Sequence, residues 1–530
     1  MSQSPSADPR PAGRRRPWRV WLAVALAILL TPFLLGVGVL GTLWARADIS
    51  TAGTVVFTRP LAIPPLAASH LDADGRRVFD LRLQAGTTDF GLDRPTATWG
   101  INGSYLGPTL RATRGEQVAV HVTNDLGQTT TLHWHGMHLP AAMDGGPHQR
   151  IEPGATWSPR WTINQPATTL WYPPHLHGAT AQHVYRGLAG LFILDDSPSA
   201  ALPLPRDYGV DDIPVIVQDK SFTGDGQLDQ DTPLFSPTGV LGHTILVNGT
   251  RGAYQQVTTE RVRLRLLNAS NARIYNFGLA DERGQARGFA LIGTDGGLLP
   301  APVQITRVQL SPGERAEIVV TMRPGERTLL RSYPAELGAD FWTQRFSGGD
   351  DILDILELRA AGTLTSSAPL PATLAPAPDL QEADATTNRT FAMDGSRINR
   401  QHLDMERIDE VVTVGDTEIW QVTNNDGTPH NFHVHDVQFQ ILDLDGAPPP
   451  ATLAGRKDTV YVAPGTTIRL LMRFADYTEP DIPYMFHCHV LRHEDRGMMG
   501  QFVVVAPGQQ PGQPAAGSQH AAGHRDDGGS

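Results

Sequence analysis

The chain has 530 residues, including 53 glycines and 42 prolines, and a formal net charge of −12 at pH 7. The length predicts about three domains, and the glycine and proline content favours short strands and turns over long helices. The negative charge argues against a nucleic-acid partner, because there is no basic field to attract phosphates.

The N-terminus has the features of an export segment. Residues 1–19 contain five arginines, and the run from Val20 to Ala45 is uncharged and long enough to cross a bilayer. Arginines before such a run predict that residues 1–19 are cytoplasmic and that the remainder is exported. Run length favours a transmembrane anchor at 20–45, although Ala45-Arg46-Ala47 resembles a signal-peptidase site and the arginine cluster resembles a twin-arginine signal. We therefore expect an extracytoplasmic protein, anchored in the membrane or secreted after cleavage.

Three segments look like copies of one strand-rich unit. Each has a turn dipeptide, an alternating strand that ends at asparagine, and a later Pro-Gly: Asn102-Gly103, Asn124 and Pro153-Gly154; Asn248-Gly249, Asn268 and Pro312-Gly313; Asp394-Gly395, Asn424 and Pro464-Gly465. Period-two alternation with frequent turns is typical of antiparallel β-sandwiches. The sequence thus predicts an all-β body with domains at 52–200, 205–361 and 387–507. An Ala-, Pro-, Thr- and Ser-rich linker is expected at 362–386, and a disordered tail at 508–530.

The register of the repeats distinguishes the middle domain from the outer two. His133 and His135 lie nine and eleven residues after Asn124, and His433 and His435 have the same spacing after Asn424. The same positions after Asn268 are Phe277 and Leu279. We therefore expect metal ligands in the first and third domains and a structural middle domain.

Four His-x-His pairs are the first sign of a metal centre: His133/His135, His175/His177, His433/His435 and His487/His489. Residues two apart in a strand point to the same face, so each pair is expected to project two imidazoles together. Eight imidazoles are enough for three metal ions, with positions left for a small ligand such as dioxygen. Imidazoles alone do not distinguish zinc, iron, nickel and copper.

Cys488 favours copper among these four metals. It is the only cysteine and lies between His487 and His489. A thiolate, two imidazoles and a weak axial methionine are the ligands of a blue-copper site. The neighbouring candidates are His430, His493 and Met498, with Met499 as the competing axial ligand. Because Cys488 should point away from its two neighbours, a copper ion on its sulfur would be a few covalent bonds from the histidine-bound metals.

These motifs resemble those of the three-domain multicopper oxidases, the family of laccases, bilirubin oxidases and bacterial cuprous oxidases, over residues 75–507. The segments that carry the resemblance are 133–136, 171–178, 430–435 and 487–499. The resemblance implies three consecutive cupredoxin-like Greek-key β-sandwiches and four copper ions. The implied ligands are His430, Cys488, His493 and Met498 for type 1; His133 and His433 for type 2; and His135, His175, His177, His435, His487 and His489 for the type 3 pair.

The resemblance also suggests roles for residues beside the copper ligands. Asp144 and Glu494 match carboxylates that assist proton delivery to oxygen, a task for general acids; solvated loop carboxylates are the alternative. Asp426 matches an acidic position near the type 1 site of cuprous oxidases, although Thr428 stands where a methionine is expected. Asp426 is therefore a candidate for binding a cation or the ring substituent of a phenol, or for capping a turn. Two departures from the family pattern adjoin ligands: Asn431 replaces proline and Asp436 replaces glycine.

The implied activity is one-electron oxidation of a reductant at the type 1 copper, coupled to four-electron reduction of dioxygen to water. Phenols and aromatic amines are favoured as substrates, with cuprous or manganous ion second. Two possibilities from another class stay open: a non-catalytic exported scaffold, such as a cell-division protein, and a copper carrier. The complete ligand set argues against a scaffold, and a carrier would not need a type 1 site joined to a trinuclear cluster. A copper nitrite reductase would need fewer His-x-His pairs.

Overall fold

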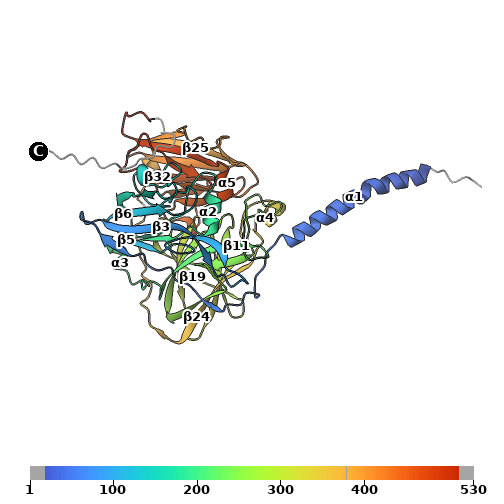
Figure 1. Cartoon of the computed structure of the whole chain (residues 1–530), viewed down its shortest axis with the longest axis horizontal. Helices are drawn as coiled ribbons and strands as arrows, with labels where there is room; N and C mark the ends of the chain where they lie inside the picture. Colours follow the sequence, from blue (N-terminus) through green and yellow to red (C-terminus); the bar gives the residue numbers. More distant parts are fainter. Residues whose placement is uncertain (1–17, 378, 513–530) are drawn as a thin grey trace, which may run out of the picture. The chain divides into compact units, whose positions relative to one another are not determined.

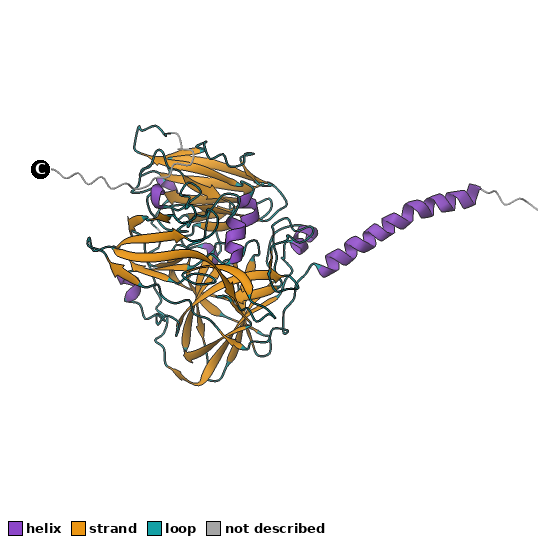
Figure 2. Cartoon of the chain, in the orientation of Figure 1, coloured by secondary structure: helices purple, strands orange, loops and turns teal. Residues whose placement is uncertain are grey.

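The computed structural model describes residues 18–377 and 379–512 (Figure 1). The chain forms two compact units, one up to Asp48 and one from Ile49 onwards. Strands are the main regular secondary structure of the second unit (Figure 2), so the predicted all-β body is confirmed. Residues 1–17 of the predicted cytoplasmic segment and residues 513–530 of the predicted tail lie outside the described residues.

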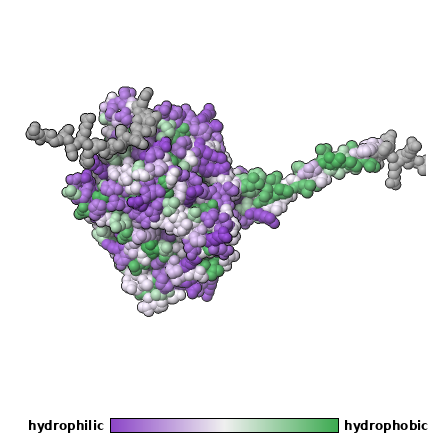
Figure 3. Space-filling model, in the orientation of Figure 1, coloured by the Kyte–Doolittle hydropathy of each residue, from purple (hydrophilic) through white to green (hydrophobic). Residues whose placement is uncertain are grey.

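The first unit contains one long helix, α1 (Trp18–Arg46), which includes Pro32. Twenty-nine residues at about 1.5 Å each exceed the roughly 30 Å thickness of a hydrocarbon layer. Its apolar side chains are exposed, and Figure 3 shows hydrophobic residues along its length. Val20–Arg46 is long and apolar enough to cross a membrane, a property that signal sequences share. The predicted N-terminal apolar helix is therefore present.

The first sandwich has a six-stranded and a three-stranded sheet. Alternating apolar side chains from both sheets, among them Phe79, Val120 and Phe192, form its core. The strands of the larger sheet are β2 (Ser69–Leu71), β3 (Arg77–Thr88), β4 (Thr96–Ile101), β6 (Gln117–Asn124), β7 (Thr156–Trp157) and β8 (Arg160–Thr162), and those of the smaller are β5 (Leu110–Thr113), β9 (Thr168–Trp171) and β10 (Leu191–Asp195).

The middle sandwich has an eight-stranded and a seven-stranded sheet. The first contains β11 (Asp212–Phe222), β12 (Leu228–Asp229), β13 (Thr244–Val247), β14 (Thr250–Arg251), β16 (Arg261–Asn268), β19 (Phe289–Thr294), β20 (Gly297–Ile305) and β22 (Arg315–Thr321). The second contains β1 (Arg59–Pro60), β15 (Ala253–Thr259), β17 (Tyr275–Asp281), β18 (Ala286–Arg287), β21 (Val308–Leu310), β23 (Arg327–Tyr333) and β24 (Leu353–Thr365).

The third sandwich has two five-stranded sheets. One contains β25 (Thr387–Asp394), β26 (Arg397–Ile398), β28 (Thr417–Asn424), β30 (Gln440–Leu444) and β32 (Thr467–Arg473), and the other β27 (Glu410–Thr413), β29 (His430–Val434), β31 (Thr459–Val462), β33 (Tyr484–His487) and β34 (Met499–Val505). The short helices of the body are α2 (Thr180–Arg186), α3 (Ser197–Ala200), α4 (Phe341–Phe346) and α5 (Leu491–Asp495), with 3₁₀ turns at Ala141–Met143, Glu382–Asp384 and Ala451–Leu453.

The three sandwiches share a topology that strand alternation does not reveal. In each, an early long strand runs parallel to the strand that ends at asparagine: β3 with β6, β11 with β16, and β25 with β28. A second parallel pair occurs in the opposite sheets: β5 with β10, β15 with β24, and β27 with β34. Each sandwich therefore contains parallel as well as antiparallel neighbours. Side-chain alternation is the same for either strand direction, so the sequence pattern does not distinguish parallel from antiparallel neighbours.

The asparagine that ends the alternating strand of each repeat makes equivalent hydrogen bonds in all three sandwiches. The side-chain amides of Asn124, Asn268 and Asn424 donate to the carbonyl oxygens of Ile151, Leu310 and Val462 at 2.7, 2.9 and 3.0 Å. The backbone oxygen of each asparagine accepts a bond from the glycine of the following Pro-Gly at 2.7–3.0 Å. These three equivalent networks tie the strand that ends at asparagine to a later segment of the same sandwich, which explains the repeat.

The turn dipeptides align differently from the prediction in the third repeat. Asn102 and Asn248 have φ of 56° and 50°, and their side chains hold the neighbouring strand. Asn399, with φ of 52°, makes the corresponding bonds to Ala392 and Thr390. Asp394-Gly395 instead closes the β25–β26 hairpin. Asparagine tolerates the left-handed region because its side chain can bond locally.

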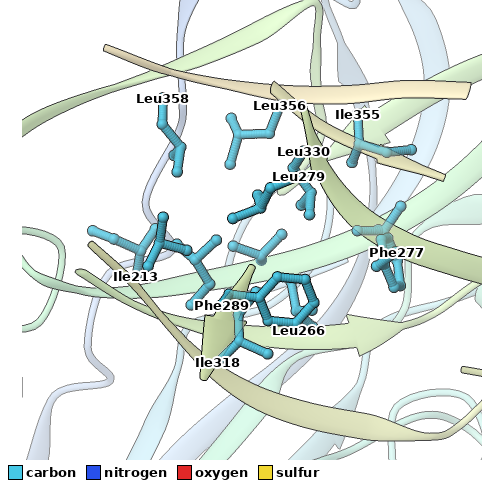
Figure 4. Packing of buried hydrophobic residues seen from close by; sticks show 14 of the residues in the cluster. Ile213, Leu266, Phe277, Leu279, Phe289, Ile318, Leu330, Ile355, Leu356 and Leu358 are labelled. Atoms are coloured by element: carbon cyan, nitrogen blue, oxygen red, sulfur yellow. The ribbon is translucent and has the colours of Figure 1, made fainter. Parts of the chain in front are cut away.

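The middle sandwich has an apolar interior where the outer sandwiches carry histidines. Phe277 and Leu279 are fully buried and pack with Ile213, Leu266 and Phe289 (Figure 4). These two positions are therefore part of a hydrophobic core.

Domain boundaries in the structure differ in detail from those expected. Strand β1 pairs with β15, so residues 59–60 of the segment assigned to the first domain belong to a sheet of the middle one. The linker assigned to 362–386 begins inside β24, and its Leu374 is buried in an apolar cluster with Leu204 and Val319. In the described part of the tail, Gly512 N–H donates to Pro480 O at 2.9 Å.

Candidate metal centre

Two pairs of chain segments position the histidines. The extended segment of His133 and His135 runs beside residues 171–173, with bonds from their N–H groups to Pro173 O at 2.8 Å and Trp171 O at 3.0 Å. In the third sandwich, β29 and β33 are antiparallel and place His433 opposite His487. Backbone hydrogen bonds therefore fix the Cα positions of these histidines independently of any metal.

Seven of the eight imidazoles of the His-x-His pairs lie together and are buried. Nitrogens of His133, His433 and His435 lie within 4.8 Å of one another, as do those of His175, His435 and His487. The rings of His135 and His433 stack at 3.8 Å, and His489 lies 4.9 Å from His135. The first and third domains thus contribute to one cluster.

His177 is the exception. Its side chain is exposed, and it lies in a turn closed by a 2.9 Å bond from Ala179 N–H to Leu176 O. The expectation that each pair lies on a strand is wrong for His175/His177, because the chain turns into α2 at Gly178, which has φ of 80°. The period-two argument does not apply to a turn. Its role as a type 3 ligand stays a prediction.

The cluster has the chemistry of a metal site. Five buried imidazole nitrogens have no hydrogen-bond partner among the described residues: Nε2 of His133, His135 and His433, and Nδ1 of His175 and His489. Buried polar atoms are normally paired. Burial and the neighbouring histidines lower the pKa values of six rings in the cluster, that of His489 to about 4 and those of His135, His175, His433, His435 and His487 well below the usual value. Neutral imidazoles with a free nitrogen are the form that binds metals.

Two buried carboxylates each reach one histidine of the first domain and one of the third. Asp144 Oδ2 lies 2.7 Å from His435 Nδ1, and its Oδ1 lies 3.4 Å from His133 Nδ1. Glu494 lies 3.5 Å from His175 Nδ1 and 3.4 Å from His487 Nδ1. Burial raises the pKa of Glu494 well above its usual value. Both predicted carboxylates are therefore beside the cluster.

A second cluster contains Cys488. Its Sγ lies 3.6 Å from Nδ1 of His430 and 3.7 Å from Nδ1 of His493, and all three side chains are buried. Burial opposes ionisation of the thiol, but the two imidazoles outweigh it and lower its pKa to about 6. Thiolate and imidazole are the ligands that blue copper takes. Cys488 thus faces one cluster while its two histidine neighbours face the other.

The methionine candidates occupy different environments. Met498 is fully buried in the same apolar cluster as Cys488, whose N–H donates to Met498 O at 3.1 Å. Met499 is in β34 and pairs with His487 across the sheet. The packing favours Met498 as the axial candidate.

Asp426 contacts a candidate ligand and caps a turn. Its Oδ2 lies 3.3 Å from His430 Nε2, and its Oδ1 accepts the Thr428 N–H at 2.7 Å. The turn-capping role that the sequence left open is therefore present, and the carboxylate also fixes the His430 ring. Binding of a cation or phenol at Asp426 stays a prediction.

Comparison with known proteins agrees with this geometry. Two family profiles described as Multicopper oxidase match residues 83–199 and 372–508. The Multicopper oxidase mco of Staphylococcus haemolyticus is 34% identical over 451 residues, which cover 84% of this chain and 92% of that protein. The chain belongs to the multicopper oxidase family.

Two further proteins of similar sequence carry different names, one a cell division protein and the other an oxidase. The Cell division protein FtsP of Xenorhabdus nematophila is 36% identical over 452 residues, covering 84% of this chain and 93% of that protein. The solved laccase-like multi-copper oxidase CueO of Ochrobactrum sp., described as having oxidase activity towards lignin model compounds, is 36% identical with a TM-score of 0.75, covering 84% of this chain and all of that one.

Sequence reasoning missed two residues that connect this multicopper oxidase's cluster to the middle domain. Asp458 O lies 2.8 Å from His433 Nδ1, and the Asp458 carboxylate pairs with the buried Arg315 of β22. Burial raises the pKa of Asp458, but Arg315 outweighs it and lowers that pKa to about 2. Neither residue has a motif, because the pair joins residues 143 positions apart in the sequence.

Asn431, at the position where the family usually has proline, forms another connection. Its amide nitrogen donates to Ser311 Oγ and Pro312 O at 2.9 Å, and its Oδ1 accepts the His489 N–H at 2.6 Å. A Cβ atom on Gly313 would lie 3.1 Å from the His489 ring. The middle domain's Pro-Gly turn is thus packed against a candidate ligand histidine.

Asp436 stands where the family usually has glycine, and its carboxylate contacts a histidine of the first domain. His138 Nδ1 lies 2.7 Å from Asp436 Oδ1, and its Nε2 lies 3.1 Å from Asp476 Oδ2. Burial lowers the pKa of His138, but the two carboxylates outweigh it and raise that pKa to about 9. A charged imidazole therefore joins the first and third sandwiches.

We expect this contact to stabilise the body in a pH-dependent way. Because the pKa of His138 rises from about 6.5 unfolded to about 9 folded, its contribution is complete below pH 6.5 and lost as pH rises through 9. His138→Gln should lower the free energy of unfolding by about 2–3 kcal/mol at pH 6 and little at pH 10, measured by urea unfolding. The exposed His121, also beside a carboxylate, is the control. An equal loss at both pH values would contradict the expectation.

Proposed function

We propose that this protein is an exported multicopper oxidase that oxidises phenols or aromatic amines one electron at a time and reduces dioxygen to water with four copper ions. The observation that carries the proposal is the pairing of a buried thiol–imidazole site with a buried histidine cluster through three consecutive residues, His487, Cys488 and His489. Sites joined in this way suit a protein that transfers electrons rather than one that stores metal.

The donor atoms suggest how the copper ions divide. His430, Cys488, His493 and Met498 would hold the type 1 ion, and His133 with His433 the type 2 ion. The type 3 pair would be held by His135, His175, His177, His435, His487 and His489, with His177 turning inward from its exposed position. Bound copper would supply one-electron acceptance at the thiolate site and a store of electrons for dioxygen at the histidine cluster.

The protein's own groups would supply protons and orientation. Glu494 holds a proton readily because burial raises its pKa, so it is suited to donate to reduced oxygen. Asp144 orients His435 and His133 from within the same cluster. Asp426 and Asp458 fix the rings of His430 and His433.

One experiment tests the proposal directly. The purified, copper-loaded protein should contain about four copper ions, absorb in the blue region and consume oxygen with a phenol faster than with cuprous or manganous ion. Faster turnover with a metal ion would favour a metallo-oxidase. Because relatives are named Cell division protein FtsP, a non-catalytic exported role is the second candidate; a colourless protein with far fewer than four copper ions would support it.

We expect Asp144→Ala to slow the oxygen half of the reaction selectively. Removing a group that serves proton transfer typically costs about a hundredfold or more, so oxygen uptake should fall by about that factor. Anaerobic bleaching of the blue band by a phenol should keep its rate, because the Cys488 site is unchanged. Asp379→Ala, at a carboxylate that is 82% exposed, is the control. Unchanged steady-state turnover would show that Asp144 is not needed.

A further inference from the structure

Another group of metal-ligating side chains lies on the exposed face of the first sandwich. His70 of β2, Asp80 of β3 and His121 of β6 come from three adjacent strands of the six-stranded sheet. Asp80 pairs directly with His121, and His70 pairs with Val78, two residues before Asp80. Because side chains two apart on a strand share a face, the two histidines flank Asp80 on the same face.

The distances within this group bracket the separation of two ligands of one ion. His121 Nδ1 lies 2.9 Å from Asp80 Oδ1, and His70 Nδ1 lies 3.9 Å from Asp80 Oδ2. Two ligand atoms about 2.1 Å from one tetrahedral zinc ion are about 3.4 Å apart. The side chains of Asp80, His70 and His121 are 68%, 59% and 44% exposed. Rotation of exposed rings therefore suffices to bring both nitrogens and the carboxylate around one ion, with positions left for water.

The strands hold the three ligand positions firmly. The opposite face of the same strands belongs to the core of the sandwich, where Phe79, Leu81 and Val120 are buried. The backbone oxygen of Asp80 also accepts the side-chain amide of Asn102 at 2.8 Å. Ligand groups on packed strands are placed more precisely than groups on loops. Metal binding here needs a change of side-chain rotamer and no change of backbone.

The charges around Asp80 also favour a cation. The two arginines of β3 are paired elsewhere, Arg77 with Glu116 and Arg82 with Asp125. Among the described residues, the ion pairs of Asp80 are with the two histidines only. Those pairs carry opposite charges only when the imidazoles are protonated. A bound divalent ion would supply a positive charge that does not depend on protonation.

The other two sandwiches show that the fold does not require this group. The strand pairs equivalent to Asp80 and His121, three residues before the repeat asparagine, are Pro214 with Arg265 and Thr390 with Gln421. Neither pair contains an imidazole or a carboxylate. The combination is therefore a local property of the first sandwich and not part of the shared sheet architecture.

From this placement we infer that His70, Asp80 and His121 bind one exchangeable divalent transition-metal ion at the surface of the first sandwich, separate from the four proposed copper ions. Two imidazoles and a carboxylate suit zinc, nickel and copper(II), and the general order of affinities favours copper(II). Calcium and magnesium are poor candidates because they prefer oxygen ligands. The inference is independent of the proposed function, since no electron transfer is involved.

Zinc titration of the copper-loaded, full-length protein tests the site. The protein is first washed with EDTA to remove loosely held ions, and calorimetry then follows Zn²⁺ binding. We expect one Zn²⁺ per chain, and at least about tenfold weaker binding in Asp80→Asn and His121→Gln, since even a group behind a metal ligand is worth about 10–100-fold in affinity. The control His243→Gln, at another exposed histidine, should bind as the wild type does.

Two histidines outside the described residues, His520 and His524, are a competing source of zinc binding. Their double substitution by glutamine is therefore measured in parallel, and it should leave the titration unchanged. Loss of the binding event in that double variant would overturn the inference, as would unchanged binding in both Asp80→Asn and His121→Gln. Urea unfolding in EDTA checks that each variant folds.

Anomalous diffraction locates the ion without any substitution. Wild-type crystals soaked in Zn²⁺ should show an anomalous peak among His70, Asp80 and His121. Peaks confined to the buried histidines or to other surface groups would overturn this site and leave the proposed oxidase intact. A colourless protein that consumes no oxygen, yet shows the peak at these three side chains, would end the oxidase proposal and support the surface site.

Discussion

Replacing Cys488 by serine is expected to abolish the blue absorption and to lower phenol-dependent oxygen uptake by roughly a thousandfold or more, the scale of removing a group on which the whole reaction depends. Cys488 supplies the thiolate of the group with His430 and His493, and a hydroxyl does not replace a thiolate as a copper ligand. Absorption spectra, copper analysis and oxygen uptake measure the change. Copper content should fall from about four to about three ions.

The histidine cluster should survive that substitution. Serine is close to cysteine in size, and Cys488 is fully buried in a packed core, so the variant should fold and still bind copper at the His-x-His pairs. Urea unfolding of the copper-free wild type and variant provides the folding control. Phenol turnover that persists in Cys488→Ser would mean that electrons reach the cluster by another path.

Replacing Arg315 by methionine is expected to cost about 3–5 kcal/mol of unfolding free energy, the typical cost of breaking a buried ion pair from one side. Arg315 is fully buried, donates to Asp458 Oδ1 at 2.7 Å in the third domain, and donates to Thr169 O at 3.0 Å in the first. Without the guanidinium, the buried Asp458 carboxylate loses its compensating charge. Denaturant unfolding at pH 7 measures the loss.

The Arg315 substitution should also reach the copper cluster. The Asp458 carbonyl holds His433 Nδ1, so a displaced Asp458 should reduce copper retention at the proposed type 2 site. Arg82→Ala breaks a solvent-exposed pair with Asp125 and should cost less than about 1 kcal/mol. If Arg315→Met were no more harmful than Arg82→Ala, the middle domain would not act as a support for the cluster.

Short-range patterns predicted much of the fold and the site. The asparagines at 124, 268 and 424 marked the three sandwiches, because each side chain closes the same local hydrogen-bond network. The register that separated His133 from Phe277 depends only on strand period. The thiol–imidazole grouping followed from Cys488 and residues within its own sandwich.

Features that depend on contacts between distant segments could not be predicted. Three such contacts join different domains: the Arg315–Asp458 ion pair, the hydrogen bond from Asn431 to Pro312 O, and the contact of Pro237 O with His493. The turn at Gly178, which leaves His177 outside the cluster, required knowledge of where α2 begins. The parallel strand pairs escaped notice because side-chain alternation carries no information on strand direction.

The histidine cluster draws on residues as far apart as His133 and His489, so it exists only after the first and last sandwiches have come together. Metal binding at the histidine cluster therefore requires the assembled body. If the polypeptide crosses the membrane unfolded, its copper must come from the pool outside the cell; if it crosses folded, the metal can be loaded from the cytosol. The translocation route thus decides which compartment's copper supply governs the yield of active enzyme.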